Sequence, residues 1–430
     1  MKNILLIVIF CFFYTNISAQ DVIKTLSEAF KNNSKLNAER ASLKATKQGV
    51  NISRGEFLPS VTISGNISSQ EDTGRTNQSG ESLEDLSSTP ETRSVLVEQK
   101  IFSGFSNYNN LKKSQLELEY AKYELTKLEQ EVILSAATAY YNLGFNFKNL
   151  EFNQLNVDLF ERQVESDKSR LERGEISLTD FAQSESSLAG AQAKLITASN
   201  ELISGKKNFQ KIIGSKSPEE INLSFIPNLS TPTSLRTASA ISDQINPKLN
   251  LAKIDLEIAE RELFAARGDL SPSASITYEK KKNYDLSTTV DEREQEEVKA
   301  TVKWPIFKGG KNISSVKKAK FRVEEKKLLF DDISDQVSID TANAWTNYNS
   351  YKSILDATTV QLKAAEIANE GITLEYDSGN TRTTLEVIQS RSLLLDARIA
   401  FAKAERDFII SKFELAFQLG TLSLNSIKSL

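Results

Sequence analysis

An internal duplication covers most of this 430-residue chain and constrains its architecture more than any other feature. When the sequence is laid over itself at an offset of about 206 residues, residues 180–186 fall on 386–392 and residues 101–104 fall on 306–309. The predicted organisation is a first repeat over 20–214, a linker over 215–243, a second repeat over 244–422 and a C-terminal tail over 423–430.

The first nineteen residues are typical of a secretory signal peptide. Lys2 precedes an apolar run over residues 4–14, and small residues follow as far as Ala19. Cys11 is followed by Phe12, so we assign it to the apolar run and not to a lipidation site. No stretch reaches the eighteen or more apolar residues of a membrane-spanning helix. We predict a signal peptide over 1–19, and strands as the elements of any membrane crossing.

Each repeat contains a long proline-free stretch with a seven-residue apolar period. The stretches follow Gly104 and Gly309, and the period predicts one helix in each, on the order of 100 Å long. Both seams slip by four residues midway, a stutter that straightens a coiled coil. The first seam is Leu111, Leu118, Leu125, Val132, Ala139, Leu143, Leu150, Val157, Val164 and Leu171. The second is Val316, Val323, Phe330, Val337, Ala344, Tyr348, Leu355, Leu362, Asn369 and Tyr376.

A short polar turn follows each long helix, at residues 173–175 and 377–380, and a second helical run then extends to about residues 213 and 419. Each repeat is therefore predicted to be a helical hairpin with a tight tip. Ser114, Ala121 and Ser135, each three residues after a seam position, are small. Small side chains permit helix packing on a second side, but an ordinary two-stranded coiled coil also fits the period.

Between each proline segment and the following long helix, the apolar period changes from seven to two. Val61, Ile63, Val95 and Val97 alternate with polar residues in the first repeat, as do Ile276, Val298 and Val302 in the second. Strands of nine or ten residues are long enough to cross a bilayer when tilted. A soluble hairpin packed on a core has the same alternation, so the pattern leaves both alternatives open.

Four strands are too few to close a barrel, so strands that span a membrane would require several copies of the chain to share one. Aromatic residues cluster at the helix ends of the predicted strands: Phe57, Phe102, Phe105, Trp304 and Phe307. Such a cluster would serve as an interfacial aromatic girdle. It would equally serve as a core where helix meets sheet.

The composition excludes several kinds of chemistry. The chain has no histidine, and Cys11 is its only cysteine, which removes histidine acid–base catalysis, His or Cys metal sites, thiol nucleophiles and disulfides. A net charge of −4 gives no reason to expect nucleic acid as a partner. We therefore expect a protein that is not an enzyme and holds neither a cofactor nor a metal.

The chain resembles TolC-type outer-membrane efflux proteins over nearly the whole predicted mature sequence. The most specific stretches are Trp-Pro-Ile-Phe-Lys-Gly-Gly at 304–310, Tyr-Asp-Ser-Gly-Asn-Thr-Arg at 376–382 and Leu-Gly-Thr-Leu at 419–422. The resemblance implies a mostly α fold with membrane β structure. Long hairpins would form a periplasmic α-barrel, and four strands per chain would contribute to a twelve-stranded barrel shared by a homotrimer. It also implies a passive duct in the Gram-negative outer membrane, with a periplasmic adaptor, an inner-membrane pump and outer-membrane lipid as partners.

The resemblance also assigns residues to the pore entrance. Gly174 and Gly379 would lie at the tips that meet the adaptor. Asp180 and Glu386 match acids just inside the entrance, where a carboxylate ring would favour cations. Gln389 stands where a second acid is expected, so a double acidic ring is not predicted. Arg382 and Asp377 would form the link between protomers that closes the tip, while Glu386 fits a solvated helix charge equally well.

Three other classes compete with this hypothesis. A periplasmic coiled-coil adaptor of an export system is the main alternative, although adaptors usually carry one hairpin, not two. A secreted structural coiled coil would not need period-two segments bounded by proline. An enzyme is least favoured, because no paired acids recur outside the repeat.

Overall fold

The computed structural model describes residues 22–221, 227–287, 290–378 and 382–428. The predicted signal peptide and Gly379 lie outside these residues. The chain divides into two compact units, each drawn from both repeats. The hairpin unit comprises Met1–Arg40, Tyr123–Asn250 and Asp332–Leu430, and the strand unit comprises Ala41–Lys122 and Leu251–Asp331. In the described part of the chain, no helix combines the length and apolarity needed to cross a membrane.

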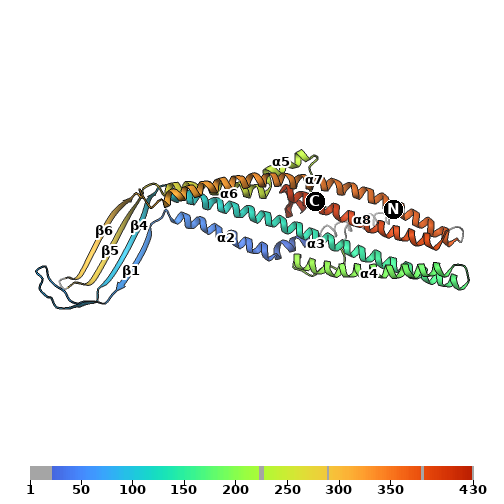
Figure 1. The fold of residues 1–430 in the computed structure, drawn as a ribbon, viewed down its shortest axis with the longest axis horizontal. Coiled ribbons are helices and arrows are strands. Elements are labelled where there is room, and N and C mark those ends of the chain that lie inside the picture. The colour runs from blue at the N-terminus through green and yellow to red at the C-terminus, as the bar shows by residue number, and fades with distance from the viewer. Residues whose placement is uncertain (1–21, 222–226, 288–289, 379–381, 429–430) are drawn as a thin grey trace, which may run out of the picture. The chain divides into compact units, whose positions relative to one another are not determined.

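A four-stranded antiparallel sheet forms the core of the strand unit (Figure 1). Its strands are β1 (Ser60–Ile67), β4 (Glu91–Ser103), β5 (Ser273–Ser287) and β6 (Val290–Lys303), in the order β1-β4-β5-β6. The pairing of β4 with β5 joins the strand hairpins of the two repeats. In the first hairpin connection, β2 (Gln70–Asp72) pairs with β3 (Leu86–Ser88). The central strands are thus fully paired, whereas β1 and β6 each have one neighbour.

The two faces of this sheet differ in polarity, as the period of two predicts. The register aligns Val61 with Val97, Val97 with Tyr278 and Tyr278 with Val298, which places these side chains on one face. We call it the apolar face, and Ile63, Val95, Ile276 and Val302 also lie on it. The other face carries Thr62, Ser94, Thr277, Lys281 and Lys299. Because Ile63, Val298 and Val302 are more than 70% exposed, the described residues leave this part of the apolar face uncovered.

Two glycines allow backbones to meet at the helix end of the sheet. A Cβ on Gly104 would lie 2.2 Å from the carbonyl oxygen of Gly268, and a Cβ on Gly268 would lie 2.4 Å from that of Gly104. Only glycine permits this approach. Gly104 precedes α3 (Ser106–Glu172), and Gly268 ends α6 (Pro247–Gly268). Within the same unit, Lys113 on α3 pairs with Glu262 on α6 at 2.7 Å.

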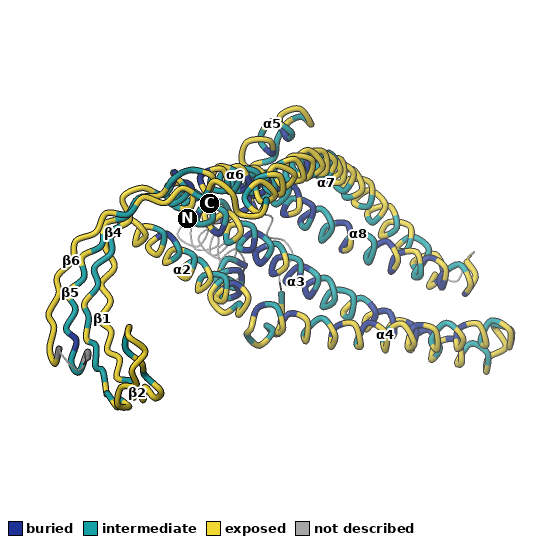
Figure 2. Tube along the Cα trace, turned by 60° about the vertical axis from the view of Figure 1, so that its left-hand side comes forward, coloured by how far each residue is buried: buried dark blue, intermediate teal, exposed yellow. Residues whose placement is uncertain are grey.

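Two helical hairpins form most of the hairpin unit. The bounds of their helices agree with the long helices that the seven-residue period predicts. In the first repeat α3 is followed by α4 (Leu178–Ile213), and in the second α7 (Lys311–Asp377) is followed by α8 (Thr384–Leu419). All twenty seam positions are buried or half-buried (Figure 2). The largest buried side chains include Tyr141, Phe209 and Phe413, from α3, α4 and α8. Residues 22–32 are helical, and α2 (Ser34–Gly55) follows after a break at Asn33.

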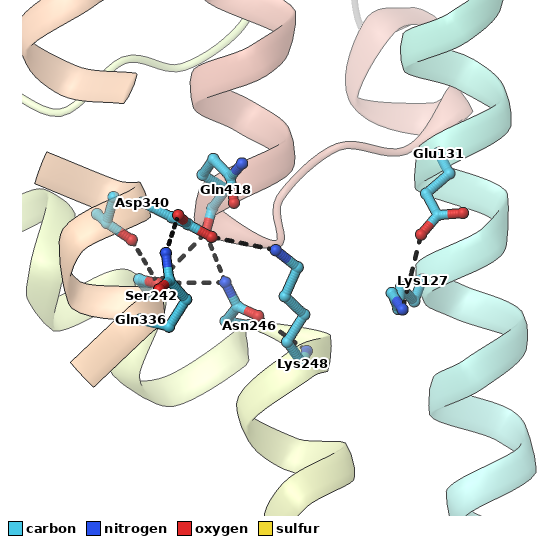
Figure 3. A network of polar contacts seen from close by, with 9 residues as sticks. Lys127, Glu131, Ser242, Asn246, Lys248, Gln336, Asp340 and Gln418 are labelled. Carbon is cyan, nitrogen blue, oxygen red and sulfur yellow. Dashed lines mark hydrogen bonds and ion pairs between the residues drawn. The ribbon is translucent and has the colours of Figure 1, made fainter. Parts of the chain in front are cut away.

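A further helix, α5 (Leu235–Ile245), lies mostly within the segment assigned to the linker. It begins at the N-cap Ser234, whose side chain accepts a hydrogen bond from the Thr237 amide. Hydrogen bonds of buried polar side chains connect α5 to both helices of the second hairpin (Figure 3). Thr341 of α7 donates to Ser242 at 2.9 Å, and Asn246 donates to the Gln418 carbonyl of α8 at 2.7 Å. Ala238 and Ile241 also pack against Leu415 and Leu419 of α8, so these bonds add to an apolar contact that the sequence analysis did not single out.

Gly420 joins elements of both repeats at the end of α8. Its φ of 78° is left-handed, and the Thr421 amide donates back to the Ala416 carbonyl at 2.9 Å. Its own carbonyl accepts a 2.8 Å hydrogen bond from Gln130 of α3. A Cβ here would lie 2.8 Å from the Ile245 carbonyl oxygen. After Gly420, the short helix α9 (Leu424–Lys428) packs Ile427 into the core.

Gly420→Ala should therefore destabilise the protein more than Gly174→Ala. Both positions have positive φ, which costs an alanine about 1 kcal/mol, but Gly174 faces open space. Overlap with Ile245 should raise the cost at Gly420 to about 2 to 4 kcal/mol. The midpoint of thermal unfolding, followed by circular dichroism in detergent, measures the difference. Equal midpoints for the two variants would contradict the close approach at Gly420.

Candidate site at the helical tips

The tips of the two hairpins line a common cavity of about 610 Å³, open to solvent, within the hairpin unit. The first repeat lines it with Arg170, Gly174, Glu175, Ile176, Ser177 and Asp180. The second repeat lines it with Tyr376, Arg382, Thr383 and Thr384. The structure thus brings Gly174, Asp180 and Arg382 of the predicted entrance residues to one place. We call this region the tip site.

Gly174 ends α3 in the conformation that the polar turn predicts. Its φ is 73°, the Glu175 amide donates to the Arg170 carbonyl at 2.9 Å, and the Gly174 amide donates to the Leu171 carbonyl at 2.9 Å. These two bonds satisfy carbonyls that the helix end would leave unpaired. The Arg173 guanidinium donates twice to Glu175 and holds the pKa of that carboxyl below its usual range. The turn is therefore fixed by local bonds.

Asp180 and Glu386 occupy equivalent positions in the two repeats, each in a capping box. Asp180 accepts from the Ser177 amide at 3.1 Å, and the Ser177 hydroxyl accepts from the Asp180 amide at 3.2 Å. Glu386 accepts from the Thr383 amide at 2.8 Å, and Thr383 accepts from the Glu386 amide at 3.3 Å. Each carboxylate satisfies free amides at the positive end of a helix. The sequence shows the signal for this role in Ser-Leu-Thr-Asp and Thr-Thr-Leu-Glu.

Arg382 pairs with two glutamates of its own chain. Its Nε lies 2.6 Å from Glu375, and a terminal nitrogen lies 3.0 Å from Glu386. The Thr383 amide, and then Arg382, hold the pKa of Glu386 below its usual range, so Glu386 remains ionised in moderately acid solution. Asp377, the predicted partner of Arg382, is not among these contacts. Gln389 is exposed.

A buried carboxylate that the sequence analysis did not single out ties the two hairpins together beside the cavity. Asp167 of α3 is fully buried. It accepts hydrogen bonds from Gln163 at 2.9 Å, from Tyr376 of α7 at 3.1 Å and from Ser184 of α4. Tyr376 also bonds Thr384 of α8 at 3.1 Å, and burial raises the pKa of its hydroxyl. Four helices from both repeats thus meet through one set of polar groups.

The sequence did contain a signal for Asp167. It lies three residues after the seam position Val164, where the earlier turns of α3 carry Ala121 and Leu128. A carboxylate in such a row must find donors if it is buried. Tyr376, its partner, is itself a seam residue, and the Arg170 guanidinium lies 4.4 Å from the centre of its ring. The periodicity located both residues but not their contact.

The predicted interface aromatics lie at the helix end of the sheet in the strand unit. Phe57, Phe102, Phe105, Trp304 and Phe307 are all exposed, and Phe102 and Phe105 meet edge to face at 5.3 Å. Within a single chain they do not form the core of a helix–sheet junction. Elsewhere, among the described residues, no three or more Cys, Asp or Glu side chains are grouped to hold a metal ion.

Asp167→Asn should loosen the tips while leaving the rest of the fold intact. The amide replaces one acceptor with a donor that faces donor groups, which costs about 1 to 3 kcal/mol for a buried group. Hydrogen exchange near residues 163–184 should accelerate. Asp158→Asn is the matched control, because Asp158 accepts only an exposed bond from Gln154 of its own helix. Equal exchange in the two variants would refute a stabilising role for the network.

Curated relatives align with nearly the whole chain. The outer membrane efflux protein BepC of Brucella suis is 24% identical over 403 residues, covering 94% of this chain and 86% of its own length. The outer membrane protein TolC of Escherichia coli is 22% identical over 428 residues, covering 96% of this chain and 84% of its own. Both alignments include the strands and both hairpins.

Solved structures share the fold at low identity. The CmeC outer membrane channel of Campylobacter jejuni superposes with a TM-score of 0.82 at 16% identity, covering 94% of this chain and 86% of that one. VceC of Vibrio cholerae gives 0.79 at 17% identity, covering 93% and 96%. The outer membrane efflux protein profile matches residues 25–215 and 242–421, one segment for each repeat. The chain therefore belongs to the outer membrane efflux protein family.

Proposed function

We propose that this chain is one subunit of a homotrimeric, passive efflux duct in the outer membrane. Its strands would lie in the membrane and its hairpins in the periplasm. The observation that carries the proposal is a sheet with an exposed apolar face and two edges that its own chain leaves unpaired. Backbone groups cannot remain unpaired in lipid, so β1 of one copy must pair with a strand of another.

Family membership decides between this function and the main alternative. A periplasmic adaptor would need neither two complete hairpins nor an uncovered apolar sheet face. The family consists of outer membrane efflux proteins, and its profile matches both repeats. We propose that the tips meet a periplasmic adaptor and that an inner-membrane pump supplies the energy, so that the duct itself carries out no chemistry.

We further propose that Asp180 and Glu386 set the charge of the entrance. Three copies would bring together three of each carboxylate near the tips, and a ring of like charges favours ions of opposite sign. The capping boxes hold the carboxylates in place. Gln389 would contribute no charge to this ring. The exposed aromatics Phe57, Phe102, Trp304 and Phe307 would mark the membrane interface nearest the helices.

Asp180→Asn combined with Glu386→Gln should lower the cation preference of single channels in a planar bilayer. Glutamine at this position still accepts from the N-cap amide, and asparagine retains an acceptor oxygen, so the variant removes charge more than structure. We expect the permeability ratio of K⁺ to Cl⁻ to fall several-fold. Current–voltage curves in a salt gradient measure the ratio.

Glu219→Gln, at an exposed position of the inter-repeat segment, is the matched control, with the same kind of charge change away from the tips. An unchanged K⁺ to Cl⁻ permeability ratio in the tip variant would show that Asp180 and Glu386 only cap their helices and do not set ion selectivity. Failure of the unmodified protein to form channels at all would refute the duct.

Arg382→Gln should raise single-channel conductance several-fold, because we propose that Arg382 holds the tip closed through charge-assisted bonds. Removing it leaves Glu375 and Glu386 as unpaired like charges. Asp377→Asn distinguishes the two possible partners of Arg382. The same rise in conductance would identify Asp377 of a neighbouring copy as the partner, and unchanged conductance would indicate that Arg382 acts through Glu375 and Glu386 of its own chain. Unaltered conductance in Arg382→Gln would exclude Arg382 from closure.

A further inference from the structure

On β4, β5 and β6 the apolar face of the sheet becomes charged toward the strand ends that lie away from the helices, whereas on β1 it remains apolar as far as Ile67, which aligns with Glu91. On β6, Val302 and Val298 are followed on the same face by Glu296, Glu294 and Glu292. On β5, Ile276 and Tyr278 are followed by Lys280 and Lys282, and on β4 Val95 is followed by Arg93. We call these charged residues, together with Glu91 and Tyr284, the charged belt. The belt lies on the face that carries the apolar side chains, not on the polar face.

The basic groups of the belt are held in exposed ion pairs. Lys280 lies 2.8 Å from Glu294 and 2.9 Å from Glu296, Lys282 pairs with Glu292, and Arg93 pairs with Glu91. Exposed pairs of this kind contribute little to stability, so a lysine can exchange a carboxylate for another anion at small cost. Phosphate is such an anion and accepts several charge-assisted bonds.

An aromatic ring lies among these cations. The Arg93 guanidinium is 5.5 Å and the Lys282 ammonium 5.0 Å from the centre of the Tyr284 ring. Tyr284 aligns with Glu91 and Glu292 on the neighbouring strands, at the far side of Lys282 from the apolar residues. The order along the face is therefore apolar side chains, then Lys280, then Lys282 aligned with Arg93, and then the aromatic ring of Tyr284.

The height of the belt slightly exceeds one layer of lipid head groups. Glu296 and Glu292 are four residues apart, about 13 Å along the strand, which is about 9 to 11 Å along the membrane normal at a tilt of about 35 to 45°. One head-group layer of a bilayer is roughly 5 to 8 Å thick. Residues in the hydrocarbon region would be apolar, as Val298 and Tyr278 are, so the belt begins where the hydrocarbon would end.

From this order we infer that the charged belt binds a phosphorylated glycolipid of the outer leaflet. Acyl chains contact the apolar side chains, Lys280, Lys282 and Arg93 contact the phosphates, and the Tyr284 ring packs against a sugar. The carboxylates that the lysines release and the lipid phosphates are both oxygen ligands for Mg²⁺, which limits repulsion between them. The inference rests on the proposed function, because only strands in the membrane place this face against lipid.

Lys280→Gln combined with Lys282→Gln tests the inference in the detergent-solubilised full chain. Bis-phosphorylated lipid A is the probe, with dephosphorylated lipid A in a parallel arm, both in buffer that contains Mg²⁺. We expect the double variant to bind the phosphorylated lipid about tenfold more weakly, since each basic residue near an anionic surface contributes to the free energy of binding. Binding of the dephosphorylated lipid should be weak and equal in both proteins.

Lys281→Gln combined with Lys299→Gln is the matched control, because it removes the same charge from the polar face. It should bind like the unmodified protein, and Lys280→Arg with Lys282→Arg should restore binding. Unreduced affinity in the belt variant, or an equal loss in the control, would overturn the inference. Channel formation in planar bilayers is measured for each variant. A belt variant that forms channels and binds the lipid as the unmodified protein does would refute lipid binding by the belt but leave the proposed duct standing.

Discussion

The unpaired edges of the sheet are the constraint on which the rest of the structure depends. Within one chain β1 and β6 each have one neighbour, and the apolar face between them is uncovered. A sheet of this kind is stable only when further strands complete its hydrogen bonds and an apolar medium covers its face. The duplication supplies two strand hairpins from one chain, and the β4–β5 pairing joins them. The resemblance to the efflux family implies a barrel of twelve strands, which corresponds to three protomers of four strands each.

The sequence predicted those elements whose residues repeat with a regular period. Seven-residue seams located α3 and α7 to within two or three residues, since burial of one stripe is what stabilises a long helix. Alternation located the four main strands and their two faces for the same reason. It did not locate α5, because that helix has 11 residues, too few for an apolar pattern to repeat, and is held in part by the hydrogen bonds of Ser242, Asn246 and Thr341.

Contacts between distant polar residues were the part of the site that the sequence could not predict. Asp167 and Tyr376 are 209 residues apart, and only the packing of α3 against α7 brings them together. The predicted link between Arg382 and Asp377 joins two protomers and stays a prediction; within one chain Arg382 pairs with Glu375 and Glu386. Several carboxylates lie within one or two helical turns of Arg382, and the side-chain rotamer of Arg382 determines which of them it contacts. Local rules decide such a choice only for motifs as short as the capping boxes.

The two repeats have diverged at the tips in a way that changes their electrostatics. Ser177 and Thr383 are equivalent N-caps, so the residue before each is also equivalent: Ile176 in the first repeat and Arg382 in the second. Glu386 is therefore neutralised in part by its ion pair with Arg382, whereas Asp180 lines the same pocket as Arg170 and Arg382 and, among the described residues, makes no ion pair. A carboxylate paired with arginine contributes less field to a pore than an unpaired one. If the tips form the entrance, Asp180 of the first repeat should contribute more of its negative potential than Glu386, although the two acids occupy the same place in the fold.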